Sequence, residues 1–126
     1  MAALCILQGG TMKLIIAEKP SVALFIAKVV GASSRKDGYI QGNGYMVSWC
    51  VGHLIQMASP DKYDEKYAKW NLDDLPILPK DFKYEVSKNT KKQYGVLKKL
   101  LHLKEVDTVI NACDAGREGE LIFRLV

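Results

Sequence analysis

The sequence predicts an α/β protein in which a mostly parallel sheet carries helices on both faces. Short apolar, β-branched runs alternate with segments of helical periodicity along the 126 residues. The chain has the length of one domain with a single core, and 48% of its residues are hydrophobic and 25% charged. No apolar run reaches the roughly 20 residues that cross a bilayer, so we expect no membrane partner.

The first strand and helix are predicted near the N-terminus. Residues 12–17 contain the run Leu-Ile-Ile, which is typical of a strand buried on both faces. Pro20 begins a helical pattern that stops at Gly31. We expect the buried face of this helix to consist of its larger apolar residues, namely Val22, Phe25, Ile26, Val29 and Val30.

A hairpin and a long excursion are predicted next. After a polar loop, residues 38–41 and 45–51 resemble strands joined at Gly42-Asn43-Gly44. Residues 59–87 are expected to form an inserted excursion, because prolines interrupt them. Within this excursion, residues 61–87 carry 5 basic and 7 acidic groups, so it is locally acidic.

The second half repeats the alternation of helix and strand. Residues 89–103 predict a helix with one leucine face and one lysine face. A strand is expected over residues 106–113, and a further helix from about Glu118. The apolar pattern of that helix still continues at Val126, so we expect the chain to be the N-terminal piece of a longer protein.

Charge and cysteine content limit the partners and the compartment. The formal net charge is +4, which suits a polyanionic partner without requiring one. The three cysteines are far apart and form no Cys-x-x-Cys pair, so the sequence predicts reduced thiols in the cytoplasm. Neither phosphate-loop spacing, GxGxxG or GxxxxGK[ST], occurs, so ATP and NAD are not indicated.

Acidic residues follow two of the predicted strands. Glu18 follows the first strand, and Asp114 and Glu118 follow the last. Ligands gather outside the carboxyl ends of parallel strands, so these acids are expected to face each other. Mg²⁺ commonly takes one or two carboxylates plus water and substrate phosphates, so the three acids predict a magnesium site. Acids in the first turn of a helix are also favoured by its macrodipole, and this structural interpretation stays open.

Three basic residues are candidates for phosphate contacts. Lys19 is held extended by the following proline, which would place its ammonium at the sheet edge. His53, after a strand and next to Gly52, could orient a phosphate or act as an acid. Arg117 lies within the acidic turn and could neutralise it or contact phosphate. A solvated charge or a hydrogen-bonded structural histidine explains the same residues equally simply.

Three ordered motifs carry a family resemblance. They are Met-Lys-Leu-Ile-Ile-Ala-Glu-Lys-Pro-Ser-Val-Ala (12–23), Trp-Cys-Val-Gly-His-Leu (49–54) and Asp-Ala-Gly-Arg-Glu-Gly-Glu-Leu-Ile (114–122). Together they resemble type IA DNA topoisomerases, and within that family the bacterial topoisomerase III branch. The resemblance implies that residues 12–126 form a C-terminally truncated Toprim domain, a Rossmann-like fold, with residues 1–11 as an extension.

The resemblance also implies roles for individual residues. Glu18 would exchange the proton of the 3′-oxygen, Lys19 would stabilise phosphate charge, and Arg117 would add a phosphate contact. Mg²⁺ would be held by Glu18, Asp114 and Glu118, while Lys19, His53 and Arg117 would contact single-stranded DNA. Gly116 stands where the family usually has a second aspartate, which removes one carboxylate from the site.

The nucleophilic tyrosine of such enzymes lies in a downstream domain, and no tyrosine of this chain has its motif context. We therefore expect this chain to be inactive on its own, and the parent enzyme to act without ATP at the nucleoid. Two alternatives stay open at this point. One is the Toprim domain of a primase or nuclease, and the other is a non-catalytic DNA-binding module, which Gly116 would favour.

Overall fold

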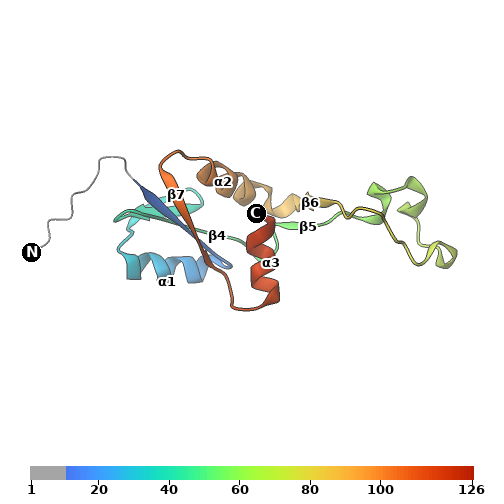
Figure 1. Cartoon of the computed structure of the whole chain (residues 1–126), viewed down its shortest axis with the longest axis horizontal. Coiled ribbons are helices and arrows are strands. Elements are labelled where there is room, and N and C mark those ends of the chain that lie inside the picture. The colour runs from blue at the N-terminus through green and yellow to red at the C-terminus, as the bar shows by residue number, and fades with distance from the viewer. Residues whose placement is uncertain (1–10) are drawn as a thin grey trace, which may run out of the picture.

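The computed structural model describes residues 11–126. The predicted N-terminal extension, apart from Thr11, and Cys5 lie outside these residues. The main sheet has five strands in the order β2-β3-β4-β1-β7 (Figure 1). These strands are β1 (Met12–Ala17), β2 (Ser34–Lys36), β3 (Tyr39–Gly42), β4 (Tyr45–Trp49) and β7 (Val106–Ala112).

The centre of the sheet is parallel, and one side is antiparallel. Strand β1 lies between β4 and β7 and runs parallel to both, with Ile15 opposite Val47 on one side and Ile110 on the other. Strands β4, β3 and β2 follow as an antiparallel meander. The α/β class predicted from the alternating pattern is therefore confirmed, with a mixed sheet whose parallel pairs surround the first strand.

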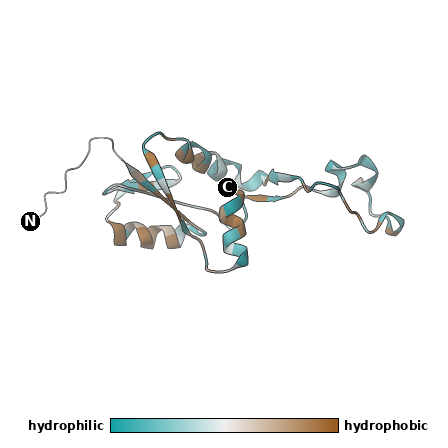
Figure 2. Ribbon diagram, viewed as in Figure 1, coloured by the Kyte–Doolittle hydropathy of each residue, from teal (hydrophilic) through white to brown (hydrophobic). Residues whose placement is uncertain are grey.

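Helices cover both faces of this sheet. Helix α1 (Pro20–Val30) packs on the face that includes Ile15 and Val47. Helices α2 (Lys91–Leu101) and α3 (Arg117–Leu125) lie on the other face. There the fully buried side chains form one core, made of Leu14, Ile16, Met46, Cys50, Leu54, Leu97, Leu100 and Ile122. Apolar residues gather on the central strands and on the helices (Figure 2).

The buried face predicted for α1 was wrong in part. Ala23 and Ala27 are the buried residues of the helix, whereas Phe25 and Val29 are 69% and 72% exposed. The two alanines allow the helix backbone to approach the sheet closely. Val22, Ile26 and Val30 are half-buried against the same core, and only Phe25 and Val29 of the predicted face point outward. Size was therefore a poor guide to burial, because close packing on the sheet requires small side chains.

One edge strand was not predicted, and the other was. Strand β2 lies in a stretch predicted as a polar loop, and all three of its residues are exposed. The strand predicted over residues 106–113 is confirmed as β7, but it lies at the edge of the sheet, and its apolar residues Val109 and Ile110 are 40% and 36% exposed. Pairing with a neighbour, rather than its own composition, makes β2 a strand.

The acidic excursion leaves the sheet through a separate two-stranded ribbon, β5 (Ile55–Met57) and β6 (Tyr84–Val86). Beyond the ribbon lie three 3₁₀ turns, η1 (Pro60–Lys62), η2 (Glu65–Ala68) and η3 (Leu72–Asp74), and a fourth, η4 (Lys88–Thr90), precedes α2. The excursion projects from one end of the sheet and is largely hydrophilic (Figures 1 and 2).

The proposed domain boundaries stay a prediction. Within residues 11–126, no helix has the length and apolarity needed to span a membrane.

Candidate functional site

The path of the chain makes the carboxyl end of β1 the expected place for a ligand crevice. From β1 the chain crosses one face of the sheet through α1 and forms β2, β3 and β4 on one side of β1. It later crosses the other face through α2 and forms β7 on the other side of β1. Strand β1 is therefore the point at which the winding direction reverses. The three strands are parallel, so their carboxyl ends meet there, which is where ligands bind in open α/β sheets.

Glu18 and Asp114 are neighbours at this crevice. The Asp114 backbone N–H donates to Glu18 Oε2 at 3.2 Å, joining residues that are 96 positions apart. The third strand end is attached as well, because the Gly52 N–H donates to the Glu18 carbonyl oxygen at 3.3 Å. The predicted approach of these two acidic strand ends is therefore present in the structure.

Glu118 and His53 form a second pair at the same edge. His53 Nε2 lies 3.2 Å from Glu118 Oε1, and the two side chains are 39% and 78% exposed. The contact links the loop after β4 to the first turn of α3. His53 was predicted as a DNA contact, and the structure adds that its ring also holds the Glu118 carboxylate.

Gly119 allows α3 to begin against the turn that carries Asp114. A Cβ atom at this position would collide with the Asp114 carbonyl oxygen and would lie 2.9 Å from the carbonyl carbon. Backbone atoms cannot move aside as a flexible side chain can, so only glycine fits this approach. Gly119 was not among the residues predicted to form the site, although a glycine inside a helical first turn signals close backbone contact.

Glu120 is engaged by two neighbouring side chains. Asn111 Nδ2 donates to Glu120 Oε2 at 3.0 Å, and Arg124 Nε donates to Glu120 Oε1 at 2.7 Å. Asn111 Oδ1 in turn accepts the Cys113 N–H at 3.0 Å. Glu120 therefore braces the turn between β7 and α3. Asn111 was missed in the sequence, because its partner lies nine positions away across the turn.

Lys19 and Arg117 flank the acids without contacting them. Lys19 caps α1 with φ −134° and ψ 149°, the extended conformation expected before proline. Arg117 is the first residue of α3, and both side chains are exposed. Within residues 11–126, neither side chain makes a hydrogen bond or an ion pair, so both cations are available to a ligand at this edge.

The donor set fits Mg²⁺ in chemistry but supplies only part of its coordination shell. Carboxylate oxygens at the crevice are the hard ligands that Mg²⁺ prefers. Among the described residues, no three His, Cys, Asp or Glu side chains converge into a metal-binding group. Gly116 has φ 168°, an extended conformation open to any residue, and a Cβ there would meet nothing within 4 Å. The space for the usual aspartate is therefore present, but its carboxylate is not.

Two thiols lie directly beneath the acids. Cys113 Sγ donates to the Ile16 carbonyl oxygen at 3.8 Å, and Cys50 is fully buried beside it in the core. Burial, followed by the charges of Cys113 and Glu18, raises the pKa of Cys50 to about 12. Burial and the Glu18 carboxylate also raise the pKa of Cys113. Both thiols are therefore protonated at neutral pH and unsuited to act as nucleophiles.

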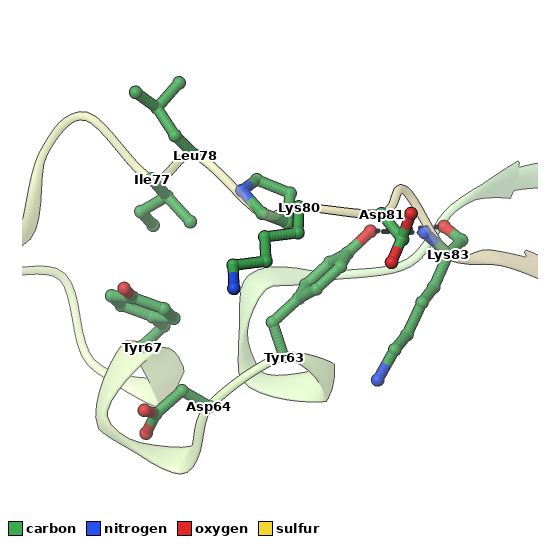
Figure 3. Close-up of a pocket in the computed structure, with 9 residues that line it drawn as sticks. Tyr63, Asp64, Tyr67, Ile77, Leu78, Lys80, Asp81 and Lys83 are labelled. Carbon is green, nitrogen blue, oxygen red and sulfur yellow. Dashed lines mark hydrogen bonds between the residues drawn. The ribbon is translucent and has the colours of Figure 1, made fainter.

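A cavity of about 340 Å³ lies in the excursion, away from the acids. Tyr63, Tyr67, Ile77, Leu78 and Lys80 line it (Figure 3). The Tyr63 hydroxyl accepts the Lys83 backbone N–H at 2.7 Å and thereby joins the two sides of the excursion. None of the predicted site residues lines this cavity, so it is separate from the acidic crevice.

Comparison with known proteins decides the family. The model of the Toprim domain matches residues 13–126. The chain belongs to the Toprim family. Over 112 residues the Toprim domain is 50% identical to the DNA topoisomerase 3 of Bacillus anthracis, which covers 89% of this chain. Over 113 residues it is 47% identical to the DNA topoisomerase 3 of Staphylococcus epidermidis (strain ATCC 12228 / FDA PCI 1200), which covers 90% of this chain.

The predicted resemblance to topoisomerase III is thus confirmed for the Toprim domain. The chain spans about 15% of the length of these relatives, 15% of the Bacillus anthracis protein and 16% of the Staphylococcus epidermidis protein. The match to topoisomerases also separates the Toprim domain from the primase and nuclease alternatives.

Proposed function

We propose that this Toprim domain is the Mg²⁺-binding part of a type IA topoisomerase III that cleaves, passes and reseals single-stranded DNA without ATP, in the cytoplasm at the nucleoid. The observation that supports this proposal best is the hydrogen bond from the Asp114 N–H to Glu18 Oε2 at 3.2 Å. It brings together two acids from opposite ends of the chain, in the crevice where open α/β sheets bind ligands.

Each residue of the crevice has a role in this proposal. Glu18, Asp114 and Glu118 hold Mg²⁺, which supplies positive charge against the phosphate. Glu18 also exchanges a proton with the 3′-oxygen during cleavage and resealing. Phosphoryl transfer depends mainly on positioning and on electrostatic stabilisation.

The basic residues hold the strand of DNA. Lys19 and Arg117 are exposed cations beside the acids, and their charges suit the negative charge that develops on a phosphodiester in the transition state. His53 orients Glu118 through the 3.2 Å contact and contacts a phosphate oxygen of the bound strand in this proposal. The attacking tyrosine belongs to a downstream domain of the longer enzyme, where it would form a 5′-phosphotyrosine and free a 3′-hydroxyl.

The metal site is tested by titrating the ¹⁵N-labelled chain with Mn²⁺. Paramagnetic broadening should appear at residues 18–19 and 114–120 together, and Mg²⁺ should reverse it. Glu18→Gln should weaken the effect at both ends, whereas Glu65→Gln, an exposed acid in the excursion, is the matched control. Broadening that is equal in the two variants, or that is confined to one strand end, would argue against a shared site.

The division of labour is tested with supercoiled DNA. The 126-residue chain with Mg²⁺ should leave the DNA unrelaxed, because no tyrosine of the chain has the context of the nucleophile. Relaxation by the chain alone that is lost in Glu18→Gln would contradict the assignment of the nucleophile to another domain.

A further inference from the structure

One side of α2 carries positive charge and no negative charge. With 3.6 residues per turn, four exposed lysines fall within about a third of the helix circumference. They are Lys91, Lys92, Lys98 and Lys99, with Gly95 at the centre of the arc. The opposite side is attached to the sheet, where Leu97 and Leu100 are buried and Gln93 Nε2 donates to the Trp49 carbonyl oxygen at 2.8 Å. We call the outer side the lysine face.

Two features of the lysine face oppose helix stability. Lys91 and Lys92 lie in the first turn, where the macrodipole disfavours cations, and that turn has no acid. One counter-ion is found, Asp37, whose Oδ2 lies 3.0 Å from Lys92 Nζ in an exposed pair. Gly95 lies inside the helix without a positive φ, and a Cβ there would meet nothing within 4 Å. The fold itself thus gives no reason for glycine at this position, which lowers helix propensity.

The start of α2 is attached to the segment that carries His53. The Leu54 carbonyl oxygen accepts the Ser87 N–H at 2.9 Å and the Thr90 hydroxyl at 3.1 Å, just before α2 begins. Leu54 follows His53, which contacts Glu118. From this point α2 runs back across the sheet towards the start of β7 (Figure 1). Helix α2 therefore begins close in the fold to the residue that contacts Glu118 and carries its lysines away from that point.

We propose that the lysine face binds the sugar–phosphate backbone of the single-stranded DNA that leads out of the acidic crevice. The inference rests on the proposed action on DNA and adds a second contact surface to it. Four ammonium groups complement a polyanion, and Gly95 leaves a gap in which a backbone can approach the helix closely. Lys91 and Lys98 are seven residues apart, roughly 10 Å along the helix.

Binding of a fluorescein-labelled oligothymidylate to the 126-residue chain, followed by anisotropy at several salt concentrations, tests the proposal. On a single strand, each phosphate contact contributes about 0.7 to the slope of log binding constant against log salt concentration. The double variant Lys98→Gln/Lys99→Gln should therefore lower the magnitude of this slope by about 1.4. Affinity at 0.1 M salt should fall roughly tenfold. The matched control, Lys62→Gln/Lys69→Gln, removes the same charge from exposed positions of the excursion and should leave the slope unchanged.

Gly95→Gln separates binding from folding. Glutamine is a better helix former than glycine and has open space at this position, so the melting temperature should rise. Its side chain fills the gap between the lysines, so DNA affinity should fall. A Gly95→Gln variant that is more stable and binds DNA less tightly supports the proposal, whereas unchanged DNA affinity in this variant would overturn it. Equal losses of affinity in Lys98→Gln/Lys99→Gln and in the control Lys62→Gln/Lys69→Gln would also overturn it.

Lysine acetylation with and without the oligonucleotide, mapped by mass spectrometry, distinguishes this inference from the proposed function. Protection of Lys91, Lys98 and Lys99 together with Lys19 supports both. Protection of Lys19 alone overturns the lysine face and leaves the crevice. Protection of the lysine face alone supports it and counts against DNA at the crevice. If DNA protects none of these lysines, both are overturned.

Discussion

Replacing Gly119 by alanine should destabilise the Toprim domain, although the same change in an ordinary helix is stabilising. Alanine gains up to about 1 kcal/mol over glycine in helix propensity. The added Cβ, however, would collide with the Asp114 carbonyl group, whose carbon lies 2.9 Å away. Forced overpacking costs about 1–3 kcal/mol, and a clash with backbone atoms that cannot move aside lies in the upper part of that range, so we expect a net loss of about 1–2 kcal/mol. For a chain of this length that lowers the melting temperature by about 4–8 °C.

Gly95→Ala is the matched control for this prediction. It makes the same change inside α2, where a Cβ would meet nothing within 4 Å, so stability should rise by about 1 kcal/mol, or about 4 °C. Calorimetry or circular dichroism on both variants measures the opposite signs directly. The displaced Asp114 should also weaken Mn²⁺ binding in Gly119→Ala alone. Equal stabilisation in the two variants would refute the close approach of α3 to the Asp114 backbone.

Four further outcomes are expected. Gly116→Asp should fold normally and bind Mn²⁺ more tightly than wild type, because the backbone is extended and the space open; unchanged affinity in a titration would contradict the assigned site. Glu120→Ala should lower the free energy of unfolding in urea by about 1 kcal/mol, because two hydrogen bonds are lost, and should leave metal affinity close to wild type. A loss of metal affinity as large as in Glu18→Gln would instead make Glu120 a metal ligand. The free energy of unfolding should fall between about pH 9 and pH 12, because the Cys50 thiol loses its proton near pH 9.0 in the unfolded chain but near pH 12 in the folded one. If the free energy of unfolding of Cys50→Ala falls as steeply over this range as that of wild type, Cys50 is not the cause. Trp70→Ala should change the free energy of unfolding by less than about 0.5 kcal/mol, because Trp70 is 90% exposed. Trp49→Ala should lower it by about 2 kcal/mol, because Trp49 packs against the core under α1. Equal losses in the two variants would place Trp70 in a packed environment.

Local chemistry made the first strand and helix predictable. The Leu-Ile-Ile run gave the bounds of β1, residues 12–17, because a strand buried on both faces tolerates little else. Pro20 and Gly31 gave the ends of α1, and Gly31 has φ 78°, the left-handed conformation that glycine adopts readily. The meeting of Glu18 and Asp114 was also predictable, because parallel strands end at the same edge.

Features that depend on neighbours distant in sequence were not predictable. The three exposed residues of β2 form a strand only because β3 offers its edge. The choice of Ala23 over Phe25 as a buried residue depends on how closely α1 approaches the sheet. The engagement of Glu120 by Asn111 depends on the shape of the turn between β7 and α3. Each involves a distance in space that composition and periodicity do not encode.

The narrow ribbon of β5 and β6 has a consequence for how the chain could be divided. Three residue pairs join its strands, and the residues beyond them lie in exposed 3₁₀ turns. A protease that cuts within these turns would leave every pairing of the five-stranded sheet intact. The two pieces would each be incomplete, since Glu18 and β4 would remain on one and α2, β7 and Asp114 on the other. The acidic crevice would then exist only when the two pieces associate. The excursion is therefore a suitable place to split the protein, and metal binding would report that the two pieces have come together.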